Sequence, residues 1–175
     1  MICCGTSARL SRKRYLAKAM HQLTPTPATI RPFCPQDCAA VSNIIHRCLR
    51  EVNIRDYGEE HITRMLPTFA SDNLPRWFEG AEPYVLVAEN QLVATGTVRG
   101  RDIQIVFVRP DYQGKGYGKQ LMAFLEQRIK TKGFAEATLN SSLTSKDFYI
   151  ALGYELVAET HGGVGGQMLA MTKRL

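Results

Sequence analysis

The chain has 175 residues, of which 45% are hydrophobic and 22% charged, enough apolar material for one well-packed core but not for two. Of the formal net charge of +6, the first 27 residues carry five basic side chains and no acid, so the rest of the chain is nearly neutral and attracts nucleic acid only weakly. No apolar run approaches the roughly 20 residues that a membrane span needs, so we expect a soluble, cytoplasmic protein with no membrane partner.

The segment 1–27 differs in composition from the remainder of the chain, because it is rich in Arg and Lys and ends in Pro and Thr. We expect a disordered basic extension there, and one folded domain at residues 28–175. Two alternatives stay open. Acid-free, Arg- and Ser-rich segments are also typical of organellar transit peptides, and a start assigned too early would make Met20 the first residue of a compact version.

From residue 28 the pattern predicts a short strand to about residue 33, and then a helix to about Val52 with Asp37 as its N-cap. A second helix is expected over residues 59–66, ended by Pro67. The period then changes to that of an antiparallel meander, with strands at residues 84–88, 92–98 and 103–108. Further elements are an amphipathic helix over 119–130, a strand over 137–140, a short helix over 145–152, and strands over 154–157 and 168–172.

The five cysteines all lie in the first third of the chain. Their odd number argues against a disulfide framework, and the spacing of Cys34, Cys38 and His46 matches no zinc pattern. We therefore expect buried thiols and no metal.

A glycine-rich stretch separates the third strand of the meander from the amphipathic helix. It reads Arg109-Pro110-Asp111-Tyr112-Gln113-Gly114-Lys115-Gly116-Tyr117-Gly118. Alternating glycines let the backbone take positive φ and approach a ligand, and a helix N-terminus points unpaired N–H groups outward, so this turn suits a diphosphate. Its spacing is neither the dinucleotide-binding G-x-G-x-x-G nor the G-K-[ST] of a P-loop.

With its flanks, this stretch resembles a known family motif. Residues Val108 to Gly118 read V-x-P-x-x-Q-x-x-G-x-G, which is similar to motif A of the GCN5-related N-acetyltransferase (GNAT) superfamily. A second motif of that family, a small or polar residue followed by A/S and then F-Y-x-x-x-G-F, is matched by Ser142, Ser145, Phe148, Tyr149, Gly153 and Tyr154. The motifs span residues 107–154, and the order of the expected elements from residue 29 onward is also similar to the family.

The resemblance implies a mixed α/β (α+β) fold, in which a central mixed, mostly antiparallel sheet is flanked by helices and splays between its fourth and fifth strands to admit acetyl-CoA. The backbone of the fourth strand would pair with the pantetheine arm, and the loop amides would hold the pyrophosphate. The residues implied in binding the donor are Val106, Phe107, Val108, Gln113, Gly114, Lys115, Gly116, Tyr117, Gly118, Lys119, Ser142, Ser145 and Phe148. Lys115 and Lys119 would add charge for the phosphates, or be solvated lysines at a helix end.

Acetyl transfer needs a neutral amine and a proton for the departing thiolate. The resemblance implies that Tyr149, at the F-Y position, is the general acid; the alternative is a tyrosine that only packs or hydrogen-bonds the CoA sulfur. The base stays open. Asp102 stands where the histone-acetylating branch carries a glutamate and ranks first, and the other candidates, each of which could equally be a surface charge, are Glu51, Asp56, Glu59, Glu60 and His61.

An acceptor site is implied between the first two helices and the sheet, with candidate lining residues Arg55, Asp56, Tyr57, His61 and Trp77. Acids at Asp56, Glu59 and Glu60 would suit a cationic amine, or simply favour a solvated helix start. We therefore expect an acetyl-CoA-dependent acyltransferase acting on a small-molecule or peptide amine by direct attack in a ternary complex. A non-catalytic acetyl-CoA sensor or partner subunit and a toxin-like aminoacyl-tRNA acetyltransferase are the alternatives, and a homodimer that uses the final strand is compatible with the sequence.

Overall fold

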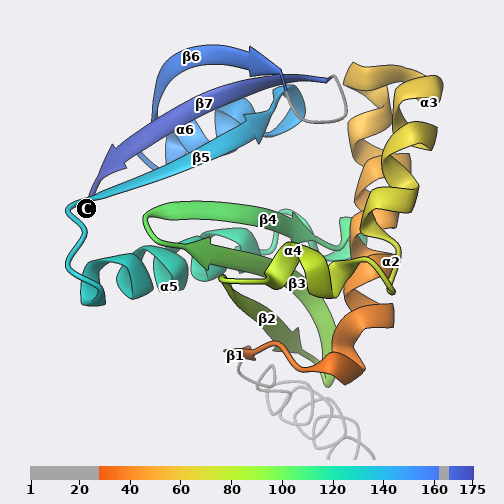
Figure 1. Ribbon diagram of the computed structural model, residues 1–175, viewed down its shortest axis with the longest axis horizontal. Coiled ribbons are helices and arrows are strands. Elements are labelled where there is room, and N and C mark those ends of the chain that lie inside the picture. The colour runs from red at the N-terminus through yellow and green to blue at the C-terminus, as the bar shows by residue number, and fades with distance from the viewer. Residues whose placement is uncertain (1–27, 162–165) are drawn as a thin grey trace, which may run out of the picture.

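The computed structural model describes residues 28–161 and 166–175, so the expected extension at residues 1–27 lies outside the described residues. The described residues form one sheet with helices against both of its faces (Figure 1). The strands are β1 (Thr29–Pro32), β2 (Glu82–Ala88), β3 (Gln91–Arg99), β4 (Asp102–Val108), β5 (Glu136–Ser142), β6 (Glu155–His161) and β7 (Gln167–Arg174). The α-helices are α2 (Cys38–Cys48), α3 (Ile54–Met65), α4 (Leu74–Phe78), α5 (Tyr117–Thr131) and α6 (Lys146–Ala151).

The sheet has the strand order β1-β2-β3-β4-β5-β7-β6, and every neighbouring pair is antiparallel except β4 and β5. This confirms the predicted mixed, mostly antiparallel sheet flanked by helices. Within the described part of the chain, β4 and β5 pair only at Asp102↔Thr138 and Ile103↔Leu139, and beyond these residues the strands part, as predicted (Figure 1). The final strand, β7, is paired on both edges, and β6 forms the outermost strand on that side of the sheet.

The amphipathic helix predicted over residues 119–130 is confirmed as α5, which packs its buried face against one side of the sheet. The buried side chains of this face are Leu121, Met122, Leu125 and Ile129. The helix lies directly on the backbone of β3, since a Cβ at Gly96 would stand 2.7 Å from Leu125 Cδ1. A side chain at this position would therefore displace the Leu125 side chain.

A β-bulge in β4 decides which of its side chains face each side of the sheet. Ile105 and Val106 together lie opposite the single residue Gly96 of β3, and Ile105 takes a φ of 53°. One extra residue inverts the alternation of side chains beyond it. As a result Ile103 belongs to the apolar core on the α5 side, whereas Ile105 and Phe107 pack on the α2–α4 side.

The helical wall beside the sheet is more irregular than the sequence pattern predicts. A π-helical segment, Leu49–Asn53, joins α2 to α3, so helical structure continues where we expected a gap before Glu59. The break falls instead at Gly58, whose φ of 75° is unfavourable for residues with a side chain. Helix α4 has no counterpart among the predicted elements, because its five residues are too few to show a helical period.

Asp37 is the N-cap residue of α2, as predicted, but its carboxylate makes no hydrogen bond to the first turn of that helix. It accepts instead from both terminal nitrogens of Arg31, at 2.7 and 2.8 Å, and from the Cys34 N–H at 2.9 Å. These hydrogen bonds, that from Arg31 above all, hold the pKa of Asp37 well below its usual range. The pair fastens β1 to the start of α2.

Candidate active site

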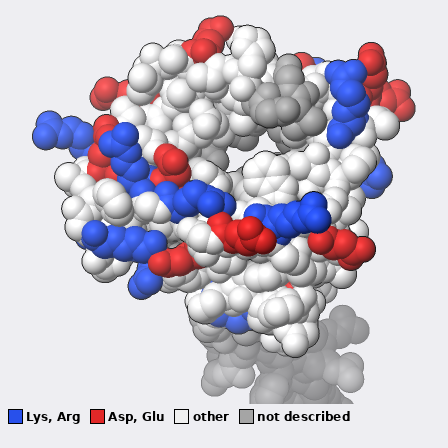
Figure 2. All heavy atoms as spheres, in the orientation of Figure 1, with Lys and Arg blue, Asp and Glu red and all other residues white. Residues whose placement is uncertain are grey.

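A cavity of about 700 Å³ opens where β4 and β5 part. Its lining comes from β4, β5, the glycine-rich loop, α6 and the wall formed by α2, Leu49–Asn53, α3 and α4. In the space-filling view the molecule is hollowed at this place, and uncharged residues form most of the visible border (Figure 2). A largely apolar hollow of this size with a few polar groups is typical of a small-molecule site.

The glycine-rich loop contributes Gly114, Gly116 and Gly118 to the cavity lining. Gly114 and Gly116 have φ values of 74° and 87°, which residues with a side chain rarely adopt, so the turn into α5 needs glycine there. A Cβ at Gly118 would lie 3.2 Å from the ring of Phe148, so this glycine lets the two helices approach. The N-cap residue Gly116 has no side chain that could accept a hydrogen bond from the first turn of α5, and that turn contains no acidic residue. The first N–H groups of α5, at the positive end of the helix dipole, therefore have no side-chain acceptor from the cap.

The edge of β4 that faces β5 presents backbone groups to the cavity. The Arg109 N–H donates to the Val93 carbonyl of β3 at 2.8 Å. Backbone groups alternate between the two edges of a strand, so Phe107 also directs its N–H and C=O toward β3, while Val106 and Val108 direct theirs toward the parting. Phe107 therefore offers the cavity its side chain and not, as expected, its backbone.

The Val108 carbonyl is already used within the protein. It accepts the Cys48 thiol at 3.1 Å and the Gln113 side-chain amide at 2.9 Å, which occupy its two lone pairs. Burial raises the pKa of Cys48 to about 12, so this thiol keeps its proton and acts as a donor. The Gln113 N–H donates to the Pro110 carbonyl at 3.3 Å. Gln113 was expected at the pyrophosphate, but its side chain hydrogen-bonds the end of β4 and so holds the glycine-rich loop to this strand.

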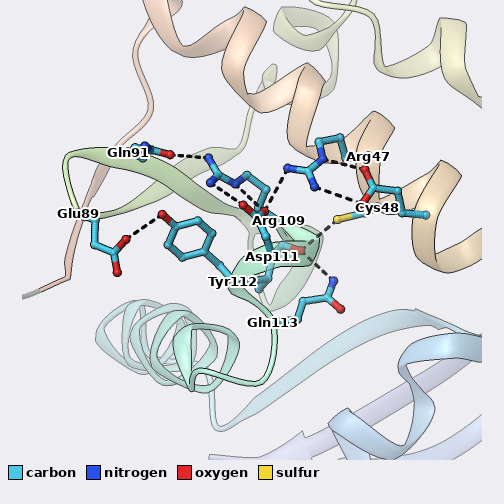
Figure 3. A network of polar contacts seen from close by, with 10 residues as sticks. Arg47, Cys48, Glu89, Gln91, Arg109, Asp111, Tyr112 and Gln113 are labelled. Atoms are coloured by element: carbon cyan, nitrogen blue, oxygen red, sulfur yellow. Dashed lines mark hydrogen bonds and ion pairs between the residues drawn. The ribbon is translucent and has the colours of Figure 1, made fainter. Parts of the chain in front are cut away.

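An ion-pair network ties the same loop to α2 (Figure 3). Asp111 accepts two hydrogen bonds of 2.8 Å from Arg109 and one of 3.1 Å from Arg47. Arg109 also donates to Gln91, and Arg47 to Glu51, each at 2.8 Å. The hydrogen bonds from Arg109 lower the pKa of Asp111 to about 2, so this carboxylate is charged at neutral pH. The network fixes the helical wall relative to the glycine loop.

Tyr112 organises the outer side of the loop. Its hydroxyl donates to Glu89 at 3.0 Å, and its ring centroid lies 4.5 Å from the Lys115 ammonium nitrogen and 5.9 Å from the ring of Tyr117. Lys115 and Tyr117 therefore stand outside the set of residues that line the cavity, whereas Lys119 lines it. Of the two lysines expected near the phosphates, Lys119 is the one that borders the cavity.

Tyr149 reaches the cavity from α6 with 7% of its surface exposed. Burial raises the pKa of its phenol, so the hydroxyl is protonated at neutral pH and is able to donate. The neighbouring residues of the second motif line the same cavity. There Ser142 donates to the Ser145 hydroxyl at 3.1 Å, and the Phe148 ring packs 5.1 Å from that of Tyr149.

The candidates for the general base lie on different elements. Asp102 lines the cavity at the end where β4 and β5 are still paired, and it accepts a hydrogen bond from the Thr138 hydroxyl. His61 lines the cavity from α3. The remaining acids lie outside the lining: Glu51, Asp56, Glu59 and Glu60. Of the predicted base candidates, Asp102 and His61 are therefore the two that border the cavity.

Of the residues expected to line an acceptor site, Tyr57, His61 and Trp77 line the cavity, whereas Arg55 and Asp56 are exposed outside it. The Tyr57 hydroxyl donates to the Gln167 carbonyl at 2.7 Å and accepts from the Leu143 N–H at 3.1 Å. Tyr57 therefore ties α3 to β7 and to the turn after β5.

Several lining residues were not among the predicted site residues. They are Cys48, Leu49, Val52, Asn53, Met65, Phe69, Ile103, Gln104, Ile105, Leu139, Asn140, Thr144, Gly166 and Met168. The π-helical segment directs Val52 and Asn53 to the cavity, and the β-bulge does the same for Ile105. Because both features interrupt the regular helical or strand period, the sequence pattern could not predict these positions.

Within residues 28–161 and 166–175, no group of three His, Cys, Asp or Glu side chains gathers as metal ligands would. In the same range Cys34, Cys38 and Cys48 are free thiols. No helix of this described range combines the length and the apolar character that a membrane crossing requires.

Solved structures of N-acetyltransferases share the fold of this chain. A GCN5-related N-acetyltransferase from Rhodopseudomonas palustris superposes with a TM-score of 0.81 at 21% identity, over 87% of this chain and 98% of that one. The PaiA N-acetyltransferase of Thermoplasma acidophilum, solved in complex with coenzyme A, gives a TM-score of 0.73 at 18% identity, over 86% of this chain and 100% of that one. The chain thus has the fold of an N-acetyltransferase.

The family is shown by the sequence. A family model of the acetyltransferase (GNAT) domain matches residues 53–175, and the chain belongs to this family. An uncharacterized acetyltransferase of Streptococcus pyogenes serotype M1 is 36% identical over 69 residues, which are 39% of this chain and 48% of the relative. The chain thus spans about half the length of the curated relatives it matches.

Proposed function

We propose that the protein is an N-acetyltransferase that moves the acetyl group of acetyl-CoA to a primary amine by direct attack in a ternary complex. One observation carries the proposal: the cavity between β4 and β5 joins the uncapped N-terminus of α5 and the Tyr149 hydroxyl in a single space. Membership in the GNAT family supports acetyl transfer, and the coenzyme A complex of the Thermoplasma acidophilum protein supports acetyl-CoA as the donor.

The donor would lie along the edge of β4. The loop amides and the N-terminus of α5 would bind the pyrophosphate, with charge from Lys119. The backbone groups of Val106 and the N–H of Val108 would pair with the pantetheine amides, since the Val108 carbonyl is occupied. Ser142 and Ser145 would face the donor from the β5 side.

In the reaction, the lone pair of the amine nitrogen forms a bond to the thioester carbon, and the carbon–sulfur bond breaks. Tyr149 donates a hydrogen bond or proton to the sulfur as negative charge develops on it. The nitrogen gives up one proton through Asp102 or His61, directly or through water. If Tyr149 has given its proton to the sulfur, this proton returns to the Tyr149 oxygen; if Tyr149 has only donated a hydrogen bond, the proton passes to the thiolate. A thiol has a pKa of about 8.5 and leaves readily, so the contribution of Tyr149 is about ten- to a hundredfold.

The proposal is tested by measuring thiol release from acetyl-CoA with a panel of amines, together with acetyl-CoA binding by calorimetry. We expect saturable binding and amine-dependent thiol release, with a mass increase of one acetyl group on the accepted amine. Binding without turnover of any amine would contradict acetyl transfer and favour an acetyl-CoA sensor.

A further inference from the structure

From the wall of the cavity opposite the donor loop, we propose that the acceptor is a small primary monoamine carried on an aromatic or branched apolar body. This inference rests on the proposed function and names the substrate class of the same site. It differs from the sequence expectation, in which acids on the second helix favoured a cationic acceptor.

Aromatic rings form the outer part of this wall. The rings of Trp77 and Phe69 are stacked, with centroids 5.5 Å apart and planes at 26°, and Phe69 meets Phe107 edge-on at 6.2 Å. The three residues come from α4, from the turn Leu66–Phe69 and from β4, and all line the cavity. The Trp77 indole N–H donates to the Thr68 carbonyl at 3.2 Å, so the orientation of this ring is fixed. A flat or branched apolar group would pack well on such a surface.

The inner part of the wall is apolar as well. Met65, Ile105 and Met168 line the cavity from three different elements. Beside them the rings of Tyr57 and His61 stack at 5.2 Å and 23°. Because the Tyr57 hydroxyl already bonds Gln167 and Leu143, its ring face, and not its hydroxyl, is what remains for a ligand.

Negative charge is scarce around this space. Among the described residues that line the cavity, Asp102 is the one carboxylate, and it lies at the closed end between β4 and β5. Two acids of α3 already have partners: Asp56, outside the lining, accepts a hydrogen bond from the lining residue Thr144, and Glu60 pairs with Arg64 at 2.6 Å. A polyamine or an amino sugar with several ammonium groups would lose hydration here without gaining partners, which is costly.

The apolar wall also suits the chemistry of attack. A desolvated amine has a lowered pKa, so an ammonium group that enters such a site loses its proton more readily and becomes a nucleophile. The volume of about 700 Å³ must also hold the pantetheine arm. The space left suits a small amine rather than a folded protein substrate.

The test compares 2-phenylethylamine and isoamylamine with ethanolamine and spermidine as acceptors for the full-length chain with acetyl-CoA. We expect kcat/KM for the two apolar amines to exceed that for ethanolamine and spermidine at least tenfold, since each buried apolar group contributes roughly that factor or more. Trp77 is the only tryptophan of the chain and is 40% exposed in the cavity wall. Its emission with bound CoA therefore reports amine binding without turnover, and 2-phenylethylamine is expected to change it while ethanolamine does not.

Trp77→Ala should raise KM for 2-phenylethylamine about tenfold and leave that for ethanolamine unchanged. Phe134→Ala is the matched control, because Phe134 is also 40% exposed but lies outside the cavity lining, and it should leave both values unchanged. Turnover of spermidine or ethanolamine at equal or higher kcat/KM overturns the acceptor class and leaves acetyl transfer standing. A change in Trp77 emission with the apolar amines but without turnover overturns acetyl transfer and supports the ligand class. If the apolar amines give neither an emission change nor turnover, both proposals are overturned.

Discussion

The two ends of the cavity are built by different means. At the end that we propose for the donor, β4 and the glycine loop present backbone groups, and the ion pairs among Arg109, Asp111 and Arg47 hold the loop. At the end that we propose for the acceptor, the lining is mostly side chains, and the elements that carry them are irregular: a π-helical segment, a helix broken at Gly58 and a bulged strand. A site that binds its ligand through backbone groups depends on turn geometry, and this geometry requires particular residues that form a sequence motif. A site that binds its ligand through side chains depends on packing between elements, and no local sequence motif marks it.

Tyr149 lines the same cavity, and its removal is expected to have the largest effect. Tyr149→Phe should lower kcat about ten- to a hundredfold, because the sulfur loses its hydrogen-bond donor, while the Kd for acetyl-CoA stays within about twofold. Steady-state kinetics and calorimetry measure the two quantities. Tyr84→Phe is the matched control, since Tyr84 is likewise 7% exposed but lies outside the cavity lining. A Tyr149→Phe variant with normal kcat would contradict the proposed acid.

A substitution in the glycine loop separates the donor end from the acceptor end. Gly116→Ala should weaken acetyl-CoA binding about tenfold, because a left-handed residue with a Cβ costs roughly 1–2 kcal/mol and displaces the first amides of α5. Gly100→Ala is the control: its φ of 60° is also positive and a Cβ there meets nothing within 4 Å, as at Gly116, but Gly100 lies in the β3–β4 turn. Both variants should lose similar thermal stability. Equal acetyl-CoA affinity in the two variants would argue against the loop as the donor site.

The smallest effect on catalysis is expected from the bond that fastens α2 to β1. Asp37→Asn should lower the free energy of unfolding by about 1–2 kcal/mol at pH 7 and leave kcat/KM of the folded protein unchanged. The folded-state pKa of Asp37 is lowered, so its contribution is present above pH of about 4 and is lost as the pH falls further. Urea unfolding at pH 7 and at pH 3 should therefore show a smaller difference between wild type and variant at the lower pH. Asp72→Asn, at an exposed acid, is the control.

The regular parts of the fold could be predicted from the sequence. The meander and α5 follow from periodicity, and the turn between them from Gly114 and Gly116, which its backbone requires. The parting of β4 from β5 was implied by the resemblance to the GNAT family that this motif carries. The terminal strands are longer than the apolar patterns at residues 154–157 and 168–172 suggest, since β6 and β7 continue as a ladder into residues with mixed side chains.

The site was predicted less completely. Asp37 matched the sequence signature of a cap, but a guanidinium from β1 competes for its carboxylate, and such a partner is not visible in local sequence. The acids of α3 suggested a cationic acceptor, but the helical continuation through Leu49–Asn53 and the break at Gly58 turn Tyr57 and His61, and not Asp56, toward the cavity. The acceptor wall is set by these irregularities, which carry no period.

Because of the bulge, β4 contains one residue more than the paired stretch of β3. A chain shorter by Ile105 could pair Val106 directly with Gly96, and Phe107 and Val108 would keep the partners and the faces they have now. The sheet would lose nothing that its hydrogen bonding requires, yet the acceptor wall would lose an apolar side chain and the strand its bend. The inserted residue is thus not needed by the ladder, and its side chain is shared between the α2–α4 packing and the cavity wall.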